Sequence, residues 1–239
     1  MNSKDRDLGF ATIDLDRQQR CGFPEVVLAE GKTCDWLVGA VSAIHEAGQD
    51  CLATRLNDEH AEALRKRFSQ ASQDRLARTF WLPVGKPVVA TGKVVIVTAG
   101  TSDLAVAKEA EVTAHAIGAE TKLIADVGVA GLHRLLKRVD EIRTADAVIV
   151  VAGMDGALPS VVGGLVACPV IAVPTSTGYG TAFGGLAALL TMLNTCSANV
   201  VTVNIDAGFK AGFVAGMIAR SAKKTTGGNH EGSPPAASQ

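Results

Sequence analysis

The sequence predicts an α/β protein whose main part is a flavodoxin-like, doubly wound parallel sheet of about five strands. From residue 93 onward, short runs of Val and Ile alternate with glycine turns and helical stretches. These runs are nearly continuous in apolar residues, as in strands that are buried on both faces. Glycine accounts for 25 of 239 residues and aromatic residues for only 4%, so the core must be aliphatic and the turns rich in glycine.

Five strand–helix units fit into this part of the chain. The apolar runs predict strands at 93–100, 121–128, 145–153, 168–174 and 199–206. The intervening segments predict helices at 103–117, 131–139, 157–166, 183–194 and 208–221. Such a sheet is expected to have the strand order 2-1-3-4-5.

Residues 1–88 are expected to form a small, mostly helical N-terminal unit. Helical spacing fits 33–48, and the highly charged segment 55–80 carries apolar residues at intervals that suit a solvated helix. Prolines around residue 85 indicate a linker, which leaves 89–221 as the α/β domain. The tail 222–239 is polar and rich in small residues, so disorder is expected there.

Composition excludes several classes of function. The chain has 23 basic and 24 acidic residues, so no broad surface for nucleic acid or anionic lipid is expected. Its five cysteines form no CxxC pair and its five histidines are scattered, so no protein-held metal site is expected. The N-terminus does not resemble a signal peptide and no run is long enough to span a membrane. These features indicate a reduced, cytoplasmic protein.

In a doubly wound sheet, ligands bind beyond the carboxyl ends of the strands. After the first strand come Gly100, Thr101, Ser102 and Asp103, followed by a helix. Backbone N–H groups and hydroxyls at that position suit a phosphate or a carboxylate. Ser102 or Asp103 acting only as a helix cap is an equally good interpretation.

The loop after the second strand contains Asp126, Gly128 and His133. Glycine lets the backbone approach a ligand closely, and both Asp126 and His133 are candidates to face the crevice. A lone histidine is more often structural than functional.

The third strand ends at Gly153, Met154 and Asp155. Asp155 between glycines is a candidate acid or base, and its alternative role is an Asx turn.

The loop after the fourth strand contains Thr175, Ser176, Gly178, Tyr179 and Gly180. Its glycines and hydroxyls suit an anion bound by backbone donors. The glycine spacing does not match the dinucleotide fingerprint, and no phosphate-loop lysine is present.

Cys196 follows the fourth helix of the α/β domain. A free cysteine usually packs as a small hydrophobe, and the negative end of a helix dipole disfavours a thiolate. By these arguments alone Cys196 is not a candidate nucleophile.

Taken in order, the motifs resemble the pyridinium-3,5-biscarboxylic acid mononucleotide synthase family (LarB), which is similar to aminoimidazole ribonucleotide carboxylase. The resemblance spans residues 20–220 and is carried by TAGTSD, DVGVAGLHR, VVAGMDGALPSVVGGL, CPVIAVPTSTGYG, FGGLAALLTMLNTC and VNIDAGF. It implies a reaction on nicotinic acid adenine dinucleotide. A second carboxylate, from carbon dioxide or bicarbonate, is added to the pyridinium ring, and cleavage of the phosphoanhydride releases AMP. The resemblance implies that this is the first step in biosynthesis of a nickel-pincer nucleotide cofactor, which serves lactate racemase or another enzyme that uses it.

The resemblance also implies roles for individual residues. Cys196 matches the family's nucleophile, which adds to the ring. Asp155 matches an acidic residue that is usually Glu, so its reach is one methylene shorter. Ser102, Asp126 and His133 fall on motifs that handle substrate or proton transfer. Mg²⁺ is expected to bind mainly through substrate phosphates and water.

Two other functions remain open from the sequence. One is a carboxylase or mutase of aminoimidazole ribonucleotide, which needs no cysteine at position 196. The other is a catalytically silent nucleotide-binding regulator with the same fold. The resemblance further implies a homo-oligomer, a tetramer or an octamer, and Ala207 and Lys210 depart from the family pattern.

Overall fold

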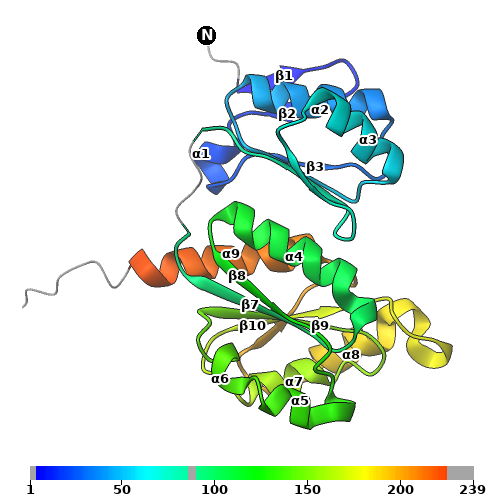
Figure 1. The fold of residues 1–239 in the computed structure, drawn as a ribbon, viewed down its shortest axis with the longest axis vertical. Helices are drawn as coiled ribbons and strands as arrows, with labels where there is room; N and C mark the ends of the chain where they lie inside the picture. Colours follow the sequence, from blue (N-terminus) through cyan, green and yellow to red (C-terminus); the bar gives the residue numbers. More distant parts are fainter. Residues whose placement is uncertain (1–3, 86–89, 225–239) are drawn as a thin grey trace, which may run out of the picture.

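The computed structural model describes residues 4–85 and 90–224, which form two units in contact (Figure 1). The expected disordered tail began at 222, but 222–224 form the end of α9, and the rest of the tail lies outside the described residues. The part of the expected linker after residue 85 also lies outside them.

The second unit is built on a five-stranded sheet of order β11-β10-β9-β7-β8, in which every neighbouring pair is parallel. Its strands are β7 (Lys93–Thr98), β8 (Glu120–Ile124), β9 (Ala147–Ala152), β10 (Val170–Pro174) and β11 (Val200–Thr202). Numbered along the chain, this order is 2-1-3-4-5. The expected fold class and strand order are therefore confirmed.

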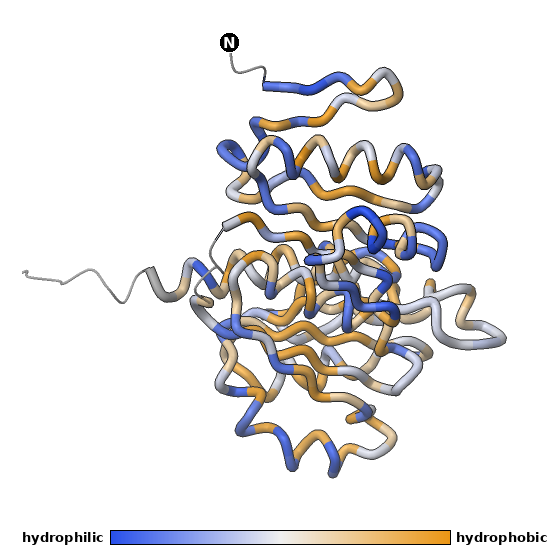
Figure 2. Tube along the Cα trace, turned by 45° about the horizontal axis from the view of Figure 1, so that its top comes forward, coloured by the Kyte–Doolittle hydropathy of each residue, from blue (hydrophilic) through white to orange (hydrophobic). Residues whose placement is uncertain are grey.

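Helices cover both faces of this sheet. Helices α4 (Leu104–Ile117) and α9 (Gly208–Lys224) pack on one face through a cluster of alanines and strand valines and isoleucines. The other face is covered by α5 (Leu132–Leu136), α6 (Val139–Ile142), α7 (Leu158–Gly163) and α8 (Leu186–Leu193). Figure 2 shows the strands between these layers as hydrophobic segments, as their sequence predicts.

Glycines allow α4 and α9 to lie very close together. A Cβ added at Gly208 would be 2.3 Å from the carbonyl oxygen of Val106, and one at Gly212 would be 2.4 Å from that of Ala110. Gly216 similarly faces the Ile117 side chain, at 2.9 Å. Any side chain larger than hydrogen at these positions would force the two helices apart.

The N-terminal unit is not mostly helical, which corrects the expectation. It contains a four-stranded sheet of order β3-β4-β6-β5 and a separate β1–β2 pair. The strands are β1 (Asp5–Asp7), β2 (Thr12–Asp14), β3 (Val26–Leu28), β4 (Cys51–Thr54), β5 (Ser72–Asp74) and β6 (Thr79–Leu82), and the helices are α1 (Arg17–Cys21), α2 (Cys34–Glu46) and α3 (Asp58–Arg67).

The length of these strands explains the error. Each has only three or four residues, which is too short for an alternating pattern to be recognised. Helix α2 does occur where it was expected, with the Thr33 hydroxyl accepting the Trp36 N–H at 3.3 Å. The charged segment 55–80 is helical only in α3 and then turns into the β5–β6 hairpin.

The two units share an apolar interdomain cluster. Phe23 of the N-terminal unit stacks on Trp81 and meets Phe213 of α9 edge to face, with ring centroids 6.2 and 5.9 Å apart. Ile117 at the end of α4 is buried in the same cluster. This cluster places the β5–β6 hairpin above the beginning of α4 (Figure 1).

Candidate active site at the carboxyl edge of the sheet

Asp103 ties together the loops at the carboxyl ends of three neighbouring strands. Its side chain is buried, and its Oδ1 accepts the Thr175 hydroxyl at 2.7 Å. Its Oδ2 accepts the backbone N–H of Gly100 at 3.0 Å. Backbone N–H of Gly153 and the hydroxyl of Thr177 act on the same carboxyl group. Asp103 is thus an organising residue of this edge, in addition to starting α4.

Burial raises the pKa of Asp103 above its ordinary value, while the hydrogen bonds from Thr175 and Gly100 act in the opposite direction. Burial costs the charged form its hydration, and the donors restore only part of it.

Close backbone packing explains the glycine at position 153. A Cβ there would lie 2.3 Å from the carbonyl oxygen of Thr177 and 2.7 Å from the hydroxyl oxygen of Thr175. The N–H of Met154 donates to the same Thr177 carbonyl at 2.9 Å. The loops after β9 and β10 therefore form one joined surface.

Most of the other predicted substrate-binding residues are accessible around this surface. Tyr179 is 81% exposed and Met154 is 46% exposed. The exposed members of the predicted set are Thr101, Ser102, Asp126, Met154, Ser176, Gly178, Tyr179 and Gly180. The chain thus presents hydroxyls and backbone groups to solvent above the loops that Asp103 holds together, as a ligand site requires.

Asp126 is paired with a residue that the sequence reasoning missed. It has a left-handed backbone (φ 58°), and its N–H donates to the Thr98 hydroxyl oxygen at 3.1 Å. Its carboxylate accepts Arg134 at 2.5 Å. His133 is exposed on the same short helix, α5. No spacing rule indicated this pair, because Asp126 lies in the loop after β8 and only Arg134 is helical.

Asp155 makes the turn that was its alternative interpretation. Its Oδ1 accepts the N–H of Ala157 at 3.1 Å, and the residue is exposed. The turn occupies one carboxylate oxygen, so the side chain still presents an acceptor to solvent at the end of β9.

Cys196 lies at the other end of the sheet from Asp103. Its segment connects α8 to β11, whose first residue pairs with Val170, the first residue of β10. The Asn199 side chain holds this segment by donating to the carbonyls of Val166 and Cys168 at 3.2 and 3.1 Å. Cys196 is exposed. One chain therefore does not bring Cys196 together with Asp103.

A hollow of about 220 Å³ adjoins the carboxyl edge on the side of the N-terminal unit. It is lined by Ser102 and Ser176 from the predicted loops and by Arg55 and Arg78 from the N-terminal unit. Arg55 pairs with the buried Glu109 of α4 at 3.2 Å, across the two units. No local motif could indicate these arginines, because they reach the edge only through packing of the units.

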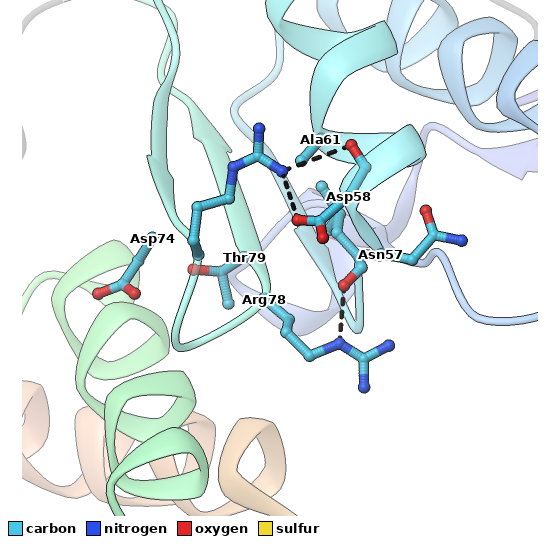
Figure 3. Close-up of a pocket in the computed structure, with 8 residues that line it drawn as sticks. Asn57, Asp58, Ala61, Asp74, Arg78 and Thr79 are labelled. Atoms are coloured by element: carbon cyan, nitrogen blue, oxygen red, sulfur yellow. Dashed lines mark hydrogen bonds and ion pairs between the residues drawn. The ribbon is translucent and has the colours of Figure 1, made fainter.

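A larger hollow, about 300 Å³, lies within the N-terminal unit (Figure 3). Arg75 closes one side of it by donating to the Asp58 carboxylate at 3.0 Å. It contains none of the predicted site residues, so its size does not make it the better candidate.

Among residues 4–85 and 90–224, no cluster of three or more His, Cys, Asp or Glu side chains is arranged to hold a metal ion. Within the same ranges, no helix has the length and hydropathy needed to cross a membrane.

Fold and site together define a two-unit α/β protein of the doubly wound class, with its ligand loops at the carboxyl edge. Two family models match the chain. One, described as a LarB/PurE-like N-terminal domain, matches residues 5–84, and the other, AIR carboxylase, matches residues 93–229. The chain belongs to the LarB/PurE-related AIR carboxylase family.

Relatives were found at two levels of similarity. An uncharacterized protein of Methanocaldococcus jannaschii, MJ0165, is 42% identical over 221 residues, which cover 89% of this chain and 85% of the relative. PurE of Treponema denticola is 19% identical with a TM-score of 0.43, over 56% of this chain and 90% of the solved one. A PurE2 variant of the same organism is 20% identical with the same TM-score and the same coverage of both chains.

Proposed function

We propose that the protein carboxylates the pyridinium ring of nicotinic acid adenine dinucleotide and cleaves its phosphoanhydride. The products are AMP and pyridinium-3,5-biscarboxylic acid mononucleotide. Membership of a carboxylase family with a LarB-like N-terminal domain supports the reaction class. The observation that carries the specific proposal is the exposed thiol of Cys196 in the motif that resembles the synthase family.

The chemistry requires a nucleophile, because a pyridinium carbon is electron-poor and does not attack carbon dioxide. Addition of the Cys196 thiolate forms a C–S bond and leaves an enamine whose free meta carbon is nucleophilic. That carbon forms a bond to carbon dioxide. A base then removes the ring proton, and departure of the thiolate restores aromaticity. The positive charge of the bound ring favours the thiolate before addition.

The carboxyl edge would bind and orient the substrate. In this proposal the hydroxyls of Ser102 and Ser176 and the loop N–H groups bind anionic groups. Asp155 or His133 removes the ring proton. Water attacks the phosphoanhydride, so that one phosphate leaves as AMP. Any Mg²⁺ would be held mainly by substrate phosphates and water.

The distance of Cys196 from Asp103 within one chain leads to a proposal about assembly. The thiol serves the carboxyl edge of a neighbouring copy in a closed homo-oligomer, a tetramer or an octamer. Exposed leucines of α8, next to Cys196 in sequence, support burial of this region between copies: Leu186, Leu190 and Leu193 are 44%, 51% and 60% exposed.

The test is incubation of the protein with nicotinic acid adenine dinucleotide, Mg²⁺ and labelled bicarbonate, with products identified by mass spectrometry. AMP together with a labelled biscarboxylated mononucleotide is expected. Cys196→Ala should lose ring labelling completely. The matched control is Cys21→Ala, because Cys21 is also exposed but belongs to the N-terminal unit.

The family offers a second candidate, a carboxylase or mutase of aminoimidazole ribonucleotide, favoured by the AIR carboxylase match. Turnover of that mononucleotide, unchanged in Cys196→Ala, would replace the proposed function with this one.

A further inference from the structure

The hollow between the two units has an unusual division of charge. Its C-terminal side contains Ser102, Ser176, Glu109 and Asp206, whereas its cationic side chains, Arg55 and Arg78, both come from the N-terminal unit. Elsewhere on the same edge, Arg134 is paired with Asp126. An anion bound here would therefore meet positive charge mainly from the N-terminal unit.

Arg78 is held in place by carbonyl groups and forms no salt bridge within the described residues, although its charge acts together with that of Arg55 on Glu109. Its Nε donates to the carbonyl of Leu56 at 2.7 Å and its Nη2 to that of Arg55 at 3.1 Å. Carbonyl groups orient a guanidinium but carry no net charge to balance it. Figure 3 shows the Arg78 guanidinium extending away from the Asp58 carboxylate.

The acidic groups of the hollow already have partners. Glu109, whose side chain is 4% exposed, pairs with Arg55 and also accepts the N–H of Phe209 at 3.2 Å. The Asp206 carboxylate accepts the N–H of Ser176 at 2.9 Å. Arg55 is thus committed to holding the units together, and Arg78 is the cation available to a ligand.

Backbone geometry indicates that the fold enforces the placement of both arginines. Arg55 and Arg78 have φ angles of 58° and 54°, in the left-handed region that non-glycine residues seldom occupy. Such conformations persist where the surrounding structure enforces them, and they concentrate at functional sites. The two residues are adjacent in space through the Arg78–Arg55 carbonyl contact.

The size of the hollow restricts what it holds. Its volume of about 220 Å³ is below the roughly 300 Å³ at which pockets for whole small-molecule ligands begin. It therefore suits one charged group of a longer ligand that continues along the carboxyl edge.

We propose that the N-terminal unit acts as a phosphate clamp, in which Arg78 binds the diphosphate group of a substrate whose reacting part lies over the carboxyl-edge loops. A planar guanidinium with fixed N–H groups matches phosphate oxygens. The identity of the ligand as a dinucleotide rests on the proposed function, but the diphosphate site itself does not. Ser102 and Ser176 complete the hollow from the other unit.

The experiment measures binding of inorganic pyrophosphate by isothermal titration calorimetry, without turnover. Arg78→Gln is expected to weaken binding at least about tenfold, as for loss of a charged hydrogen-bond donor. Arg78→Lys keeps the charge and is expected to recover part of the affinity. The matched control is Arg75→Gln, three residues away on the same hairpin, whose partner is Asp58. It should bind as the wild type does.

The melting temperature of each variant, compared with that of the wild type, shows whether the substitution has disturbed the fold. Equal pyrophosphate affinity in the wild type and Arg78→Gln, or no saturable binding by the wild type, overturns the clamp. Loss of pyrophosphate binding in Arg78→Gln without any carboxylation by the wild type supports the clamp and removes only the proposed function. If Arg78→Gln carboxylates the dinucleotide with an unchanged KM, the clamp is overturned and the proposed function stands.

Discussion

Asp103 illustrates how one side chain can organise a site without facing solvent. Four donors from three loops converge on its buried carboxyl group. Its removal should disturb Gly100, Gly153 and Thr175 together, because these groups share it as a partner. Because its pKa is raised only in the folded protein, the pH dependence of stability reports on the environment of Asp103.

We expect Asp103→Asn to change how stability depends on pH. Burial raises the Asp103 pKa in the folded state, so the folded protein binds this proton more tightly than the unfolded chain. The contribution of Asp103 to stability is thus present at low pH and is lost as pH rises from about 4, the ordinary value, through the raised folded value. Asp103→Asn has no titrating group at this position, so it does not lose this stability as the pH rises.

Chemical unfolding measured from pH 4 to pH 7 checks the expectation. The stability difference between wild type and variant should change across this window, by about 1.4 kcal/mol for each pH unit that separates the folded and unfolded pKa values of Asp103. The variant should also be less stable near pH 4, by about 1–3 kcal/mol, because an amide presents an N–H₂ group to donors. Parallel curves for the two proteins would contradict the raised pKa.

At the level of residues, the sequence located most of the edge but not its partners. The predicted loops do lie at the carboxyl ends of strands: Gly100–Asp103, Gly153–Asp155 and Thr175–Gly180. The alternation of strands and helices along the chain is enough to place them there. Arg55 and Arg78 were missed, since they approach the edge only through contacts between units. Cys196 lies at the opposite, amino edge because it precedes β11, and this placement follows from the same alternation.

At the level of elements, the contact between α4 and α9 depends on glycines that let the two helices approach closely. Gly208, Gly212 and Gly216 recur every fourth residue, so they form one face of α9. Alanines of α4 meet this face. Helix propensity and packing make opposite predictions for a substitution here.

Gly212→Ala is expected to destabilise the protein by about 1–3 kcal/mol, as overpacking does. Propensity alone would favour alanine by about 1 kcal/mol in a helix interior. The added Cβ would meet the Ala110 carbonyl oxygen at 2.4 Å, and a backbone atom cannot rotate away. Equilibrium unfolding in urea measures the change.

Lys210→Ala is the control, because Lys210 lies exposed on the same helix. It should leave stability within about 0.5 kcal/mol of the wild type. A Gly212→Ala protein as stable as this control would mean that α4 and α9 separate without cost.

The elements differ in how well the sequence predicted them. Strands such as β9, with six fully buried residues, were predictable because burial on both faces leaves a continuous apolar run. In the N-terminal unit, β5 consists of Ser, Gln and Asp, and its pairing with β6 is set by the hairpin rather than by hydropathy. Tertiary pairing overrode the helical pattern of segment 55–80 there.

At the scale of the whole molecule, an apolar surface remains uncovered on α8. Its Leu186, Leu190 and Leu193 are accompanied by Phe183, which is 72% exposed. Clusters of exposed large apolar side chains mark association sites more often than isolated ones do. This surface supports the proposed assembly of a tetramer or an octamer.

Leu190→Glu is expected to shift the protein to smaller species, because a charge would be buried between copies. Gel filtration with light scattering measures the mass. Leu28→Glu is the control: Leu28 is 50% exposed, close to the 51% of Leu190, but lies on β3 of the N-terminal unit. A monomeric wild type would contradict the assembly.

Helix α9 follows every strand of the sheet that it covers, and this order has a consequence for how the molecule is made. During synthesis from the N-terminus, the first unit emerges with its own core complete. The side of Phe23 that contacts Phe213 and the alanine face of α4 stay uncovered until α9 leaves the ribosome. Helix α9 therefore covers the sheet face and completes the contact between the two units in one step. A nascent chain that stalls before residue 208 would expose both apolar surfaces to chaperones at once.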